Sequence, residues 1–241
     1  MKSAACVCVA MVFAQAQTGN PTIQISPTKT SVTIENQPVQ ISISGTASAI
    51  SSGVTALELT IDLGDLQEHL TAVLSATVNR SDRCGERLSL ERATLAPDAP
   101  ASLLAANVNF ERYACVKALG KQIVKRLIGG HGVIEVSLIP SVADNNISLD
   151  AKVRKIDADG SLGDVLRSGD VGDSIREQIS DSIESAIQKV TDLKAALPAS
   201  IENAVSIKTV QFADGGAGRL GLKITGEVRL PADQLRRAVG Q

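Results

Sequence analysis

The feature that most constrains the fold of this chain is an alternation of apolar and polar residues with a period of two. In 57–63, Leu and Ile alternate with Glu, Thr and Asp, and in 219–230 Leu, Ile and Val alternate with Arg, Lys, Thr and Glu. Such alternation indicates antiparallel strands with one face against a core and the other in water. We expect further strands within 39–44, 88–90, 104–111, 134–138, 147–153 and 205–212, with hairpin turns at 144–146 and 214–216.

One segment repeats its apolar residues at helical spacing instead. Isoleucine recurs at every fourth position of this segment: Ile175, Ile179, Ile183 and Ile187. The apolar stripe continues to Leu197, and Pro198 ends it. This spacing predicts a long amphipathic helix over 171–197.

Together, these patterns predict an α+β fold in which a strongly curved antiparallel β-sheet wraps around one long α-helix. Short accessory helices are expected at 65–74, where Asp65 would cap the first turn, at 123–128 and after Pro231. The helix at 65–74 would bury a stripe made of Leu66, Leu70, Val73 and Leu74. Because neither a repeat of fixed period nor a long linker divides the chain, we expect residues 17–241 to form a single domain.

The amino-terminal residues have the pattern of a secretory signal peptide, predicted here as 1–16. Met1 and Lys2 precede an uncharged apolar run at 4–14, and Ala14-Gln15-Ala16 is a small-x-small cleavage site. Cys6 and Cys8 suggest a lipoprotein as the alternative, but neither follows the Leu-Ala-Gly type of box. No apolar run is long enough to span a membrane, so we expect a periplasmic or secreted protein without a membrane span.

Charge and aromatic content argue against a nucleic-acid partner. The chain of 241 residues has a formal net charge of −2, and its aromatic residues amount to 2%. Binding driven by counterion release needs a clear excess of basic residues, and single-stranded nucleic acid needs aromatic residues on which bases can stack.

Two cysteines remain after the predicted cleavage, Cys84 and Cys115. An even pair in an exported chain is most simply a structural disulfide. The rival hypothesis, a zinc or redox pair, lacks a Cys-x-x-Cys spacing and a nearby histidine.

Two short motifs resemble known catalytic or binding signatures without their usual context. Residues 216–221, Gly-Ala-Gly-Arg-Leu-Gly, match a dinucleotide fingerprint, but a strand rather than a helix should follow them. Residues 172–174, Gly-Asp-Ser, resemble the nucleophile block of certain lipases. However, the two histidines, His69 and His131, both precede it, so Asp173 and Ser174 fit better as helix caps. The sequence therefore indicates no catalytic residues and no enzyme.

Metal and cofactor sites are not predicted either. Residues 157–161 resemble the opening of a calcium loop, but Leu162 replaces the required glycine and Ser168 the bidentate glutamate. A turn that ends a strand is therefore favoured, with weak calcium binding as the alternative. His69 and His131 lack the spacing of metal ligands, and we expect both to be solvated.

The chain resembles the tubular lipid-binding superfamily, which includes the bactericidal/permeability-increasing-like proteins. The resemblance lies in the combination of strands with one apolar face, a helix with a stripe of isoleucines, a final hairpin and few aromatic residues. The resemblance covers roughly Ile23 to Leu230 and is one of layout. The chain is also similar to uncharacterised bacterial envelope families in which Cys-Gly-Glu-Arg-Leu, here 84–88, and a later cysteine, here Cys115, flank the middle of the domain. The resemblance to the tubular lipid-binding superfamily implies a single apolar tube between a curved sheet and a helix.

Two functions follow from these expectations. The first is the binding or transfer of a lipid or other apolar ligand in a tube lined by Ile175, Ile179, Ile183, Ile187, Leu222 and Ile224. The alternative is a non-catalytic periplasmic scaffold with a dry core, which holds an envelope protein on a sheet face or edge.

Overall fold

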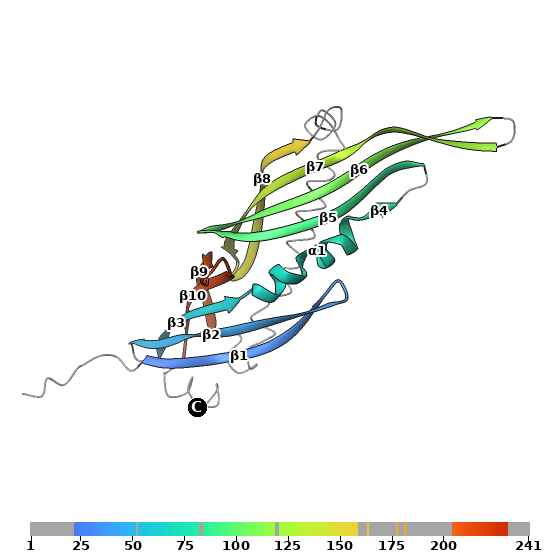
Figure 1. Ribbon diagram of the computed structural model, residues 1–241. Helices are drawn as coiled ribbons and strands as arrows, with labels where there is room; N and C mark the ends of the chain where they lie inside the picture. The colour runs from blue at the N-terminus through green and yellow to red at the C-terminus, as the bar shows by residue number, and fades with distance from the viewer. Residues whose placement is uncertain are drawn as a thin grey trace, which may run out of the picture.

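The computed structural model describes residues 22–51, 53–81, 84–118, 121–158 and 204–230, together with Gly163, Glu177 and Asp181. Within these ranges the strands pair in two five-stranded antiparallel sheets (Figure 1). The first sheet has the order β1-β2-β3-β10-β9 and consists of β1 (Thr22–Ile34), β2 (Gln37–Ser51), β3 (Val54–Asp62), β10 (Leu220–Val228) and β9 (Val205–Asp214). The second is a meander of β4 (Arg80–Ser81), β5 (Gly85–Asp98), β6 (Ala101–Ala118), β7 (Lys121–Ala143) and β8 (Asn146–Ala158).

The prediction of one curved sheet wrapped around a long helix is wrong. The strands divide between two sheets, and among the described elements it is the 15-residue helix α1 (Gly64–Val78) that lies between them (Figure 1). Alternation of period two shows which face of each strand meets the core, but it does not say which strands pair. The predicted helix at 171–197 and the predicted signal peptide lie outside the described residues, apart from Glu177 and Asp181.

Helix α1 confirms the expected helix at 65–74, although its amino terminus is built differently. Leu66, Leu70, Val73 and Leu74 are all buried, because a stripe of this spacing lies on one side of the helix. Asp65 is not the cap. The N-cap is Leu63, and the Asp65 carboxylate instead accepts a hydrogen bond of 2.6 Å from the backbone N–H of Gln40.

A single hydrophobic cluster joins the inner faces of both sheets to α1. In β10, Leu222 pairs with Ile61 of β3 and Phe212 of β9, and all three side chains are buried. In the second sheet, Leu104 of β6 pairs with Val136 of β7, and both are also buried. Because each aliphatic side chain enclosed in this way contributes about 1.5–3 kcal/mol, this cluster is the main source of stability in the described part of the chain.

Helix α1 also covers the edge of β5, beyond the two residues that pair with β4. Three of its polar side chains bond to the β5 backbone. Asn79, the C-cap, accepts from the N–H of Leu90 at 2.7 Å, and the Thr71 hydroxyl accepts from the N–H of Ala93 at 3.0 Å. The Gln67 amide donates to the carbonyl of Leu95 at 2.7 Å. These side chains take the place of a neighbouring strand, because unpaired backbone groups at a sheet edge otherwise need water or another chain.

The two sheets meet along the outer edge of β9, where turns of the second sheet supply its hydrogen bonds. Asn145, in the turn between β7 and β8, donates to the carbonyl of Val205 at 2.9 Å and accepts from the N–H of Ile207 at 2.6 Å. The carbonyl of Pro100, in the turn between β5 and β6, accepts from the N–H of Phe212 at 2.9 Å. The predicted hairpin turn at 144–146 is therefore confirmed, and it also connects the sheets.

Candidate functional site

Strands β6 and β7 are longer than the core requires, and their far ends form a hairpin, called here the arm (111–118 and 121–129). Strand β5 pairs with the arm only as far as Tyr113, so the part beyond Tyr113 is two-stranded. Figure 1 shows the arm projecting beyond the body of the molecule. Along 101–110 of β6, alternate side chains are buried, but none of the described arm side chains is buried. A two-stranded hairpin is marginally stable by itself in water, so an arm of this length needs an explanation.

The arm exposes large aliphatic side chains. The described part of the chain has four exposed large hydrophobic residues, and three of them lie on the arm: Val116 (58%), Ile123 (54%) and Leu127 (55%). Val116 is directly opposite Ile123, so the two share one face of the hairpin. Leu127 is the extra residue of a β-bulge, because the pairing shifts between Arg126↔Tyr113 and Ile128↔Arg112.

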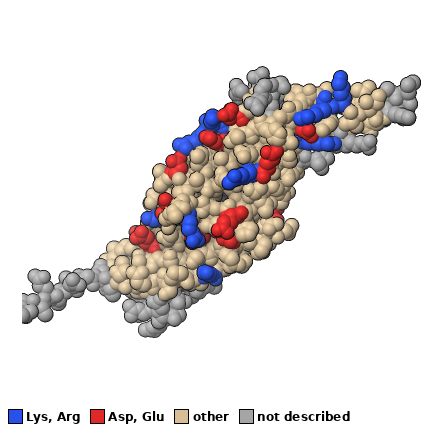
Figure 2. Space-filling view, viewed as in Figure 1, with Lys and Arg blue, Asp and Glu red and all other residues tan. Residues whose placement is uncertain are grey.

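The arm is also strongly basic. Its segment of sequence, 111–129, holds one acidic residue, Glu111, and five basic residues, Arg112, Lys117, Lys121, Lys125 and Arg126. This gives the arm a formal charge of +4 in a chain whose total is −2, so the rest of the chain carries −6. Figure 2 shows basic side chains gathered on the arm, whereas the body mixes both signs. The arm and the rest of the chain therefore carry net charges of opposite sign.

A disulfide joins the middle of the arm to the residue that precedes β5. Cys84 and Cys115 are bonded, with their Cα atoms 5.5 Å apart, which confirms the predicted disulfide. Since Cys84 directly precedes β5, the bond ties the hairpin to the neighbouring strand. A disulfide is compatible with an exported protein.

Side chains around the only tyrosine of the chain reinforce this attachment. The Tyr113 hydroxyl donates to the Glu111 carboxylate at 2.9 Å, and the Arg126 guanidinium lies 3.2 Å from the same carboxylate. The Arg87 guanidinium of β5 lies over the Tyr113 ring, 4.3 Å from its centroid. The arm is thus held to β5 by a covalent bond and by a cation–π contact.

The arm was not predicted from the sequence, and the helix expected at 123–128 is wrong. Ile123, Val124, Leu127 and Ile128 have helical spacing, but they lie in β7 and pair with β6. The bulge at Leu127 accounts for the error, because an extra residue shifts the alternation by one. The β-branched residues of the segment and Gly120, a residue type that is common in turns, were the signals for a hairpin.

Of the six residues predicted to line a lipid tube, two can be placed. Leu222 and Ile224 lie on β10 with exposures of 0% and 3%, packed in the shared core. The other four, Ile175, Ile179, Ile183 and Ile187, lie outside the described residues. The described structure therefore does not bring the two predicted walls together, and the tube stays a prediction.

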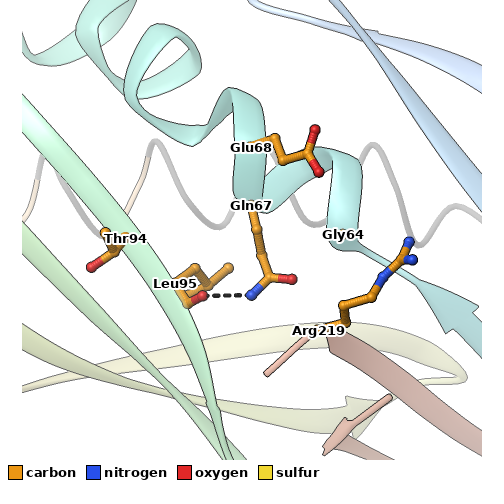
Figure 3. Close-up of a pocket in the computed structure, with 6 residues that line it drawn as sticks. All are labelled: Gly64, Gln67, Glu68, Thr94, Leu95 and Arg219. Carbon is orange, nitrogen blue, oxygen red and sulfur yellow. Dashed lines mark hydrogen bonds between the residues drawn. The ribbon is translucent and has the colours of Figure 1, made fainter. Parts of the chain in front are cut away.

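A small pocket lies between the amino end of α1, β5 and the turn before β10 (Figure 3). Two of its polar side chains, those of Gln67 and Arg219, already bond to the protein. In addition to its hydrogen bond to the carbonyl of Leu95, the Gln67 side chain donates to the carbonyl of Gly218 at 3.0 Å and accepts from the N–H of Leu220 at 2.7 Å. The Arg219 guanidinium lies 2.8 Å from the carboxylate of Asp62. The pocket is therefore a structural junction between α1 and the sheets, and it has the weaker claim to a binding role.

The segment 216–221, which matches a dinucleotide-binding fingerprint in sequence, begins with a hairpin turn, as predicted. Gly216, Ala217 and Gly218 have positive φ values of 104°, 54° and 78°, and strand β10 follows directly. The predicted Gly-Asp-Ser cap at 172–174 and most of the calcium-like loop lie outside the described residues.

The two histidines each bond to an acidic residue. His69 Nδ1 lies 2.9 Å from the carbonyl of Asp65, and His131 Nδ1 lies 3.0 Å from the Glu91 carboxylate. Both histidine side chains are substantially exposed. Among the described residues, no three His, Cys, Asp or Glu side chains form a group that could hold a metal ion.

Comparisons with protein-family models, curated proteins and solved structures found no match to this chain. The resemblance to the tubular lipid-binding superfamily thus gains no support from them, and the two-sheet architecture departs from its layout. No helix in the described ranges has the length and apolar character that crossing a membrane requires. The arm is the described feature that fold stability explains least, and it is therefore the candidate functional site.

Proposed function

We propose that the protein is an exported, non-catalytic attachment module that binds a surface of the cell envelope through the arm. The observation that carries this proposal is the cross-strand pair of Val116 and Ile123, exposed on a hairpin without a buried side chain among its described residues. Apolar side chains that share a face in water mark interaction sites more often than isolated ones do.

The attachment of the arm to β5 supports the same function. A hairpin that was free to bend would lose conformational entropy on binding, whereas one held by Cys84–Cys115 and by Arg87 against Tyr113 is already ordered. The charge of +4 on the arm, against −6 for the rest of the chain, favours approach with the arm first toward an anionic target.

The lipid-tube hypothesis is the second candidate, and the described core favours it less. Leu222 and Ile224 pack against other core side chains. A tube would need their side chains to face a gap wide enough for an acyl chain. Attachment at the surface therefore rests on exposed residues that the fold leaves unused, whereas the two described residues of the tube are ones that the core already uses.

The proposal is tested by replacing the exposed aliphatic residues of the arm. In V116T/I123T/L127T, threonine keeps the strand propensity of the arm and removes most of its apolar surface. We expect the wild-type protein to sediment with a washed envelope fraction from producing cells, and the triple variant to bind on the order of tenfold or more weakly.

Ile50 provides the matched control, because it is an equally exposed aliphatic residue (55%) on β2, outside the arm. I50T should sediment like the wild-type protein. A correctly folded triple variant that sedimented as well as the wild type would refute attachment through the arm, and so would a wild-type protein that stayed in the supernatant.

A further inference from the structure

We propose that the surface bound by the arm is an anionic phospholipid bilayer, into whose interface Val116, Ile123 and Leu127 insert while the basic residues contact lipid phosphates. This inference rests on the proposed function and names the chemistry of its target. Aliphatic residues interleaved with basic residues are the combination that binds at the boundary between headgroups and acyl chains, because burial and charge attraction act together.

The placement of charge fits a bilayer better than a protein partner. Lys125 lies opposite Ala114, on the face that Val116 and Ile123 share, whereas Lys117 lies opposite Gln122 on the other face. Basic side chains thus occur on both faces of the hairpin. A bilayer surrounds an inserted hairpin and can contact both faces, but a protein partner docked on one face would leave the other charges in water.

The size of the arm points to the same target. A stable protein interface buries about 800 Å² on each partner around a packed apolar centre. Beyond Tyr113 the arm is only two strands wide. The whole arm offers three exposed aliphatic side chains, without a described side chain that is buried beneath them. Insertion of a narrow apolar element into a lipid interface does not require a complementary surface, since lipids rearrange around it.

Flotation of the full-length mature protein with protein-free vesicles tests this inference. We expect binding to phosphatidylcholine vesicles that contain phosphatidylglycerol, little binding to pure phosphatidylcholine vesicles, and weaker binding at high salt because salt screens exposed charges. K117Q/K125Q should weaken binding about fivefold for each lysine removed, or roughly twenty-five-fold in total. V116T/I123T should weaken binding by on the order of tenfold.

K29Q/K223Q is the control for charge, because Lys29 and Lys223 are exposed lysines outside the arm and the net charge changes equally. I50T is the control for apolar surface. Both should bind vesicles like the wild-type protein. If K117Q/K125Q and K29Q/K223Q weakened binding equally, only net charge would matter and the arm would not be the lipid contact.

The failure of this inference can be separated from failure of the proposed function. A protein that sediments with the envelope fraction through the arm but ignores phosphatidylglycerol vesicles would have a non-lipid target there, so the lipid inference would be overturned and the attachment function would stand. Equal binding to both kinds of vesicle would overturn the anionic specificity. A protein that bound neither envelope nor vesicles would overturn both proposals.

Discussion

At the scale of single residues, polar side chains complete hydrogen bonds that the sheets leave open. Thr71 is an example: its hydroxyl accepts from the N–H of Ala93 at 3.0 Å and lies 3.2 Å from the carbonyl of the same residue, to which it can donate. Ala93 is buried, with 5% exposure. Water therefore has little access to these two backbone groups when the hydroxyl is absent, and a buried group without a partner is costly.

Replacement of Thr71 by valine tests this role, because valine keeps the shape of the side chain and removes the hydroxyl. We expect T71V to lower the free energy of unfolding by about 1–3 kcal/mol, measured by urea denaturation. The exposed Thr94 on β5 provides the control, and T94V should change stability by less than about 0.5 kcal/mol. Equal stability of T71V and T94V would show that Thr71 does not stabilise the β5 edge at Ala93.

At the scale of elements, the arm depends on its attachment to β5. Reduction of Cys84–Cys115 would leave contacts such as those around Tyr113 to hold the hairpin. The loop that this bond closes spans 31 residues, which corresponds to roughly 3–4 kcal/mol on the chain-entropy account.

The double variant C84S/C115S separates the arm from the body in one experiment. We expect faster amide hydrogen exchange throughout the arm, while amides in 101–110 of the same β6 strand stay protected by the core. The inner half of β6 is thus the internal control. Unchanged exchange in the arm would mean that the disulfide does not order it.

Prediction from sequence succeeded or failed element by element, for physical reasons. The helix at 65–74 was predictable because its apolar stripe meets the core on one side only. The segment 123–128 has the same kind of spacing, but β6 supplies hydrogen-bonding partners that no local pattern reveals, and the bulge at Leu127 hides the strand period. The arm was missed for a related reason, since alternation does not reveal that both faces of a strand lie in water.

At the scale of the whole molecule, the arrangement depends on contacts between residues far apart in the chain. Strand β3 pairs with β10, and Asn145 bonds to β9, although more than 50 positions separate each pair. Individual strands could be predicted from alternation. Their division into two sheets could not, because nearly identical strand patterns would fit either partner.

Replacement of Asn145 by glycine tests the junction between the sheets. Asn145 has a φ of 62°, which glycine tolerates, so the turn should persist while both side-chain bonds to β9 are lost. Asn36 has nearly the same φ of 64° in the turn between β1 and β2, so N36G is the matched control. We expect N145G to be about 1–3 kcal/mol less stable than N36G in urea denaturation.

The cover that α1 places on β5 has a consequence for the order in which the chain is made. Residues 64–78 precede 85–98, so the segment that shields the edge is synthesised before the edge itself. The exposed edge of β5 can therefore be covered by α1 as soon as β5 is synthesised, before it pairs with a strand of another copy of the chain. Variants that loosen α1 should consequently self-associate, in addition to losing stability.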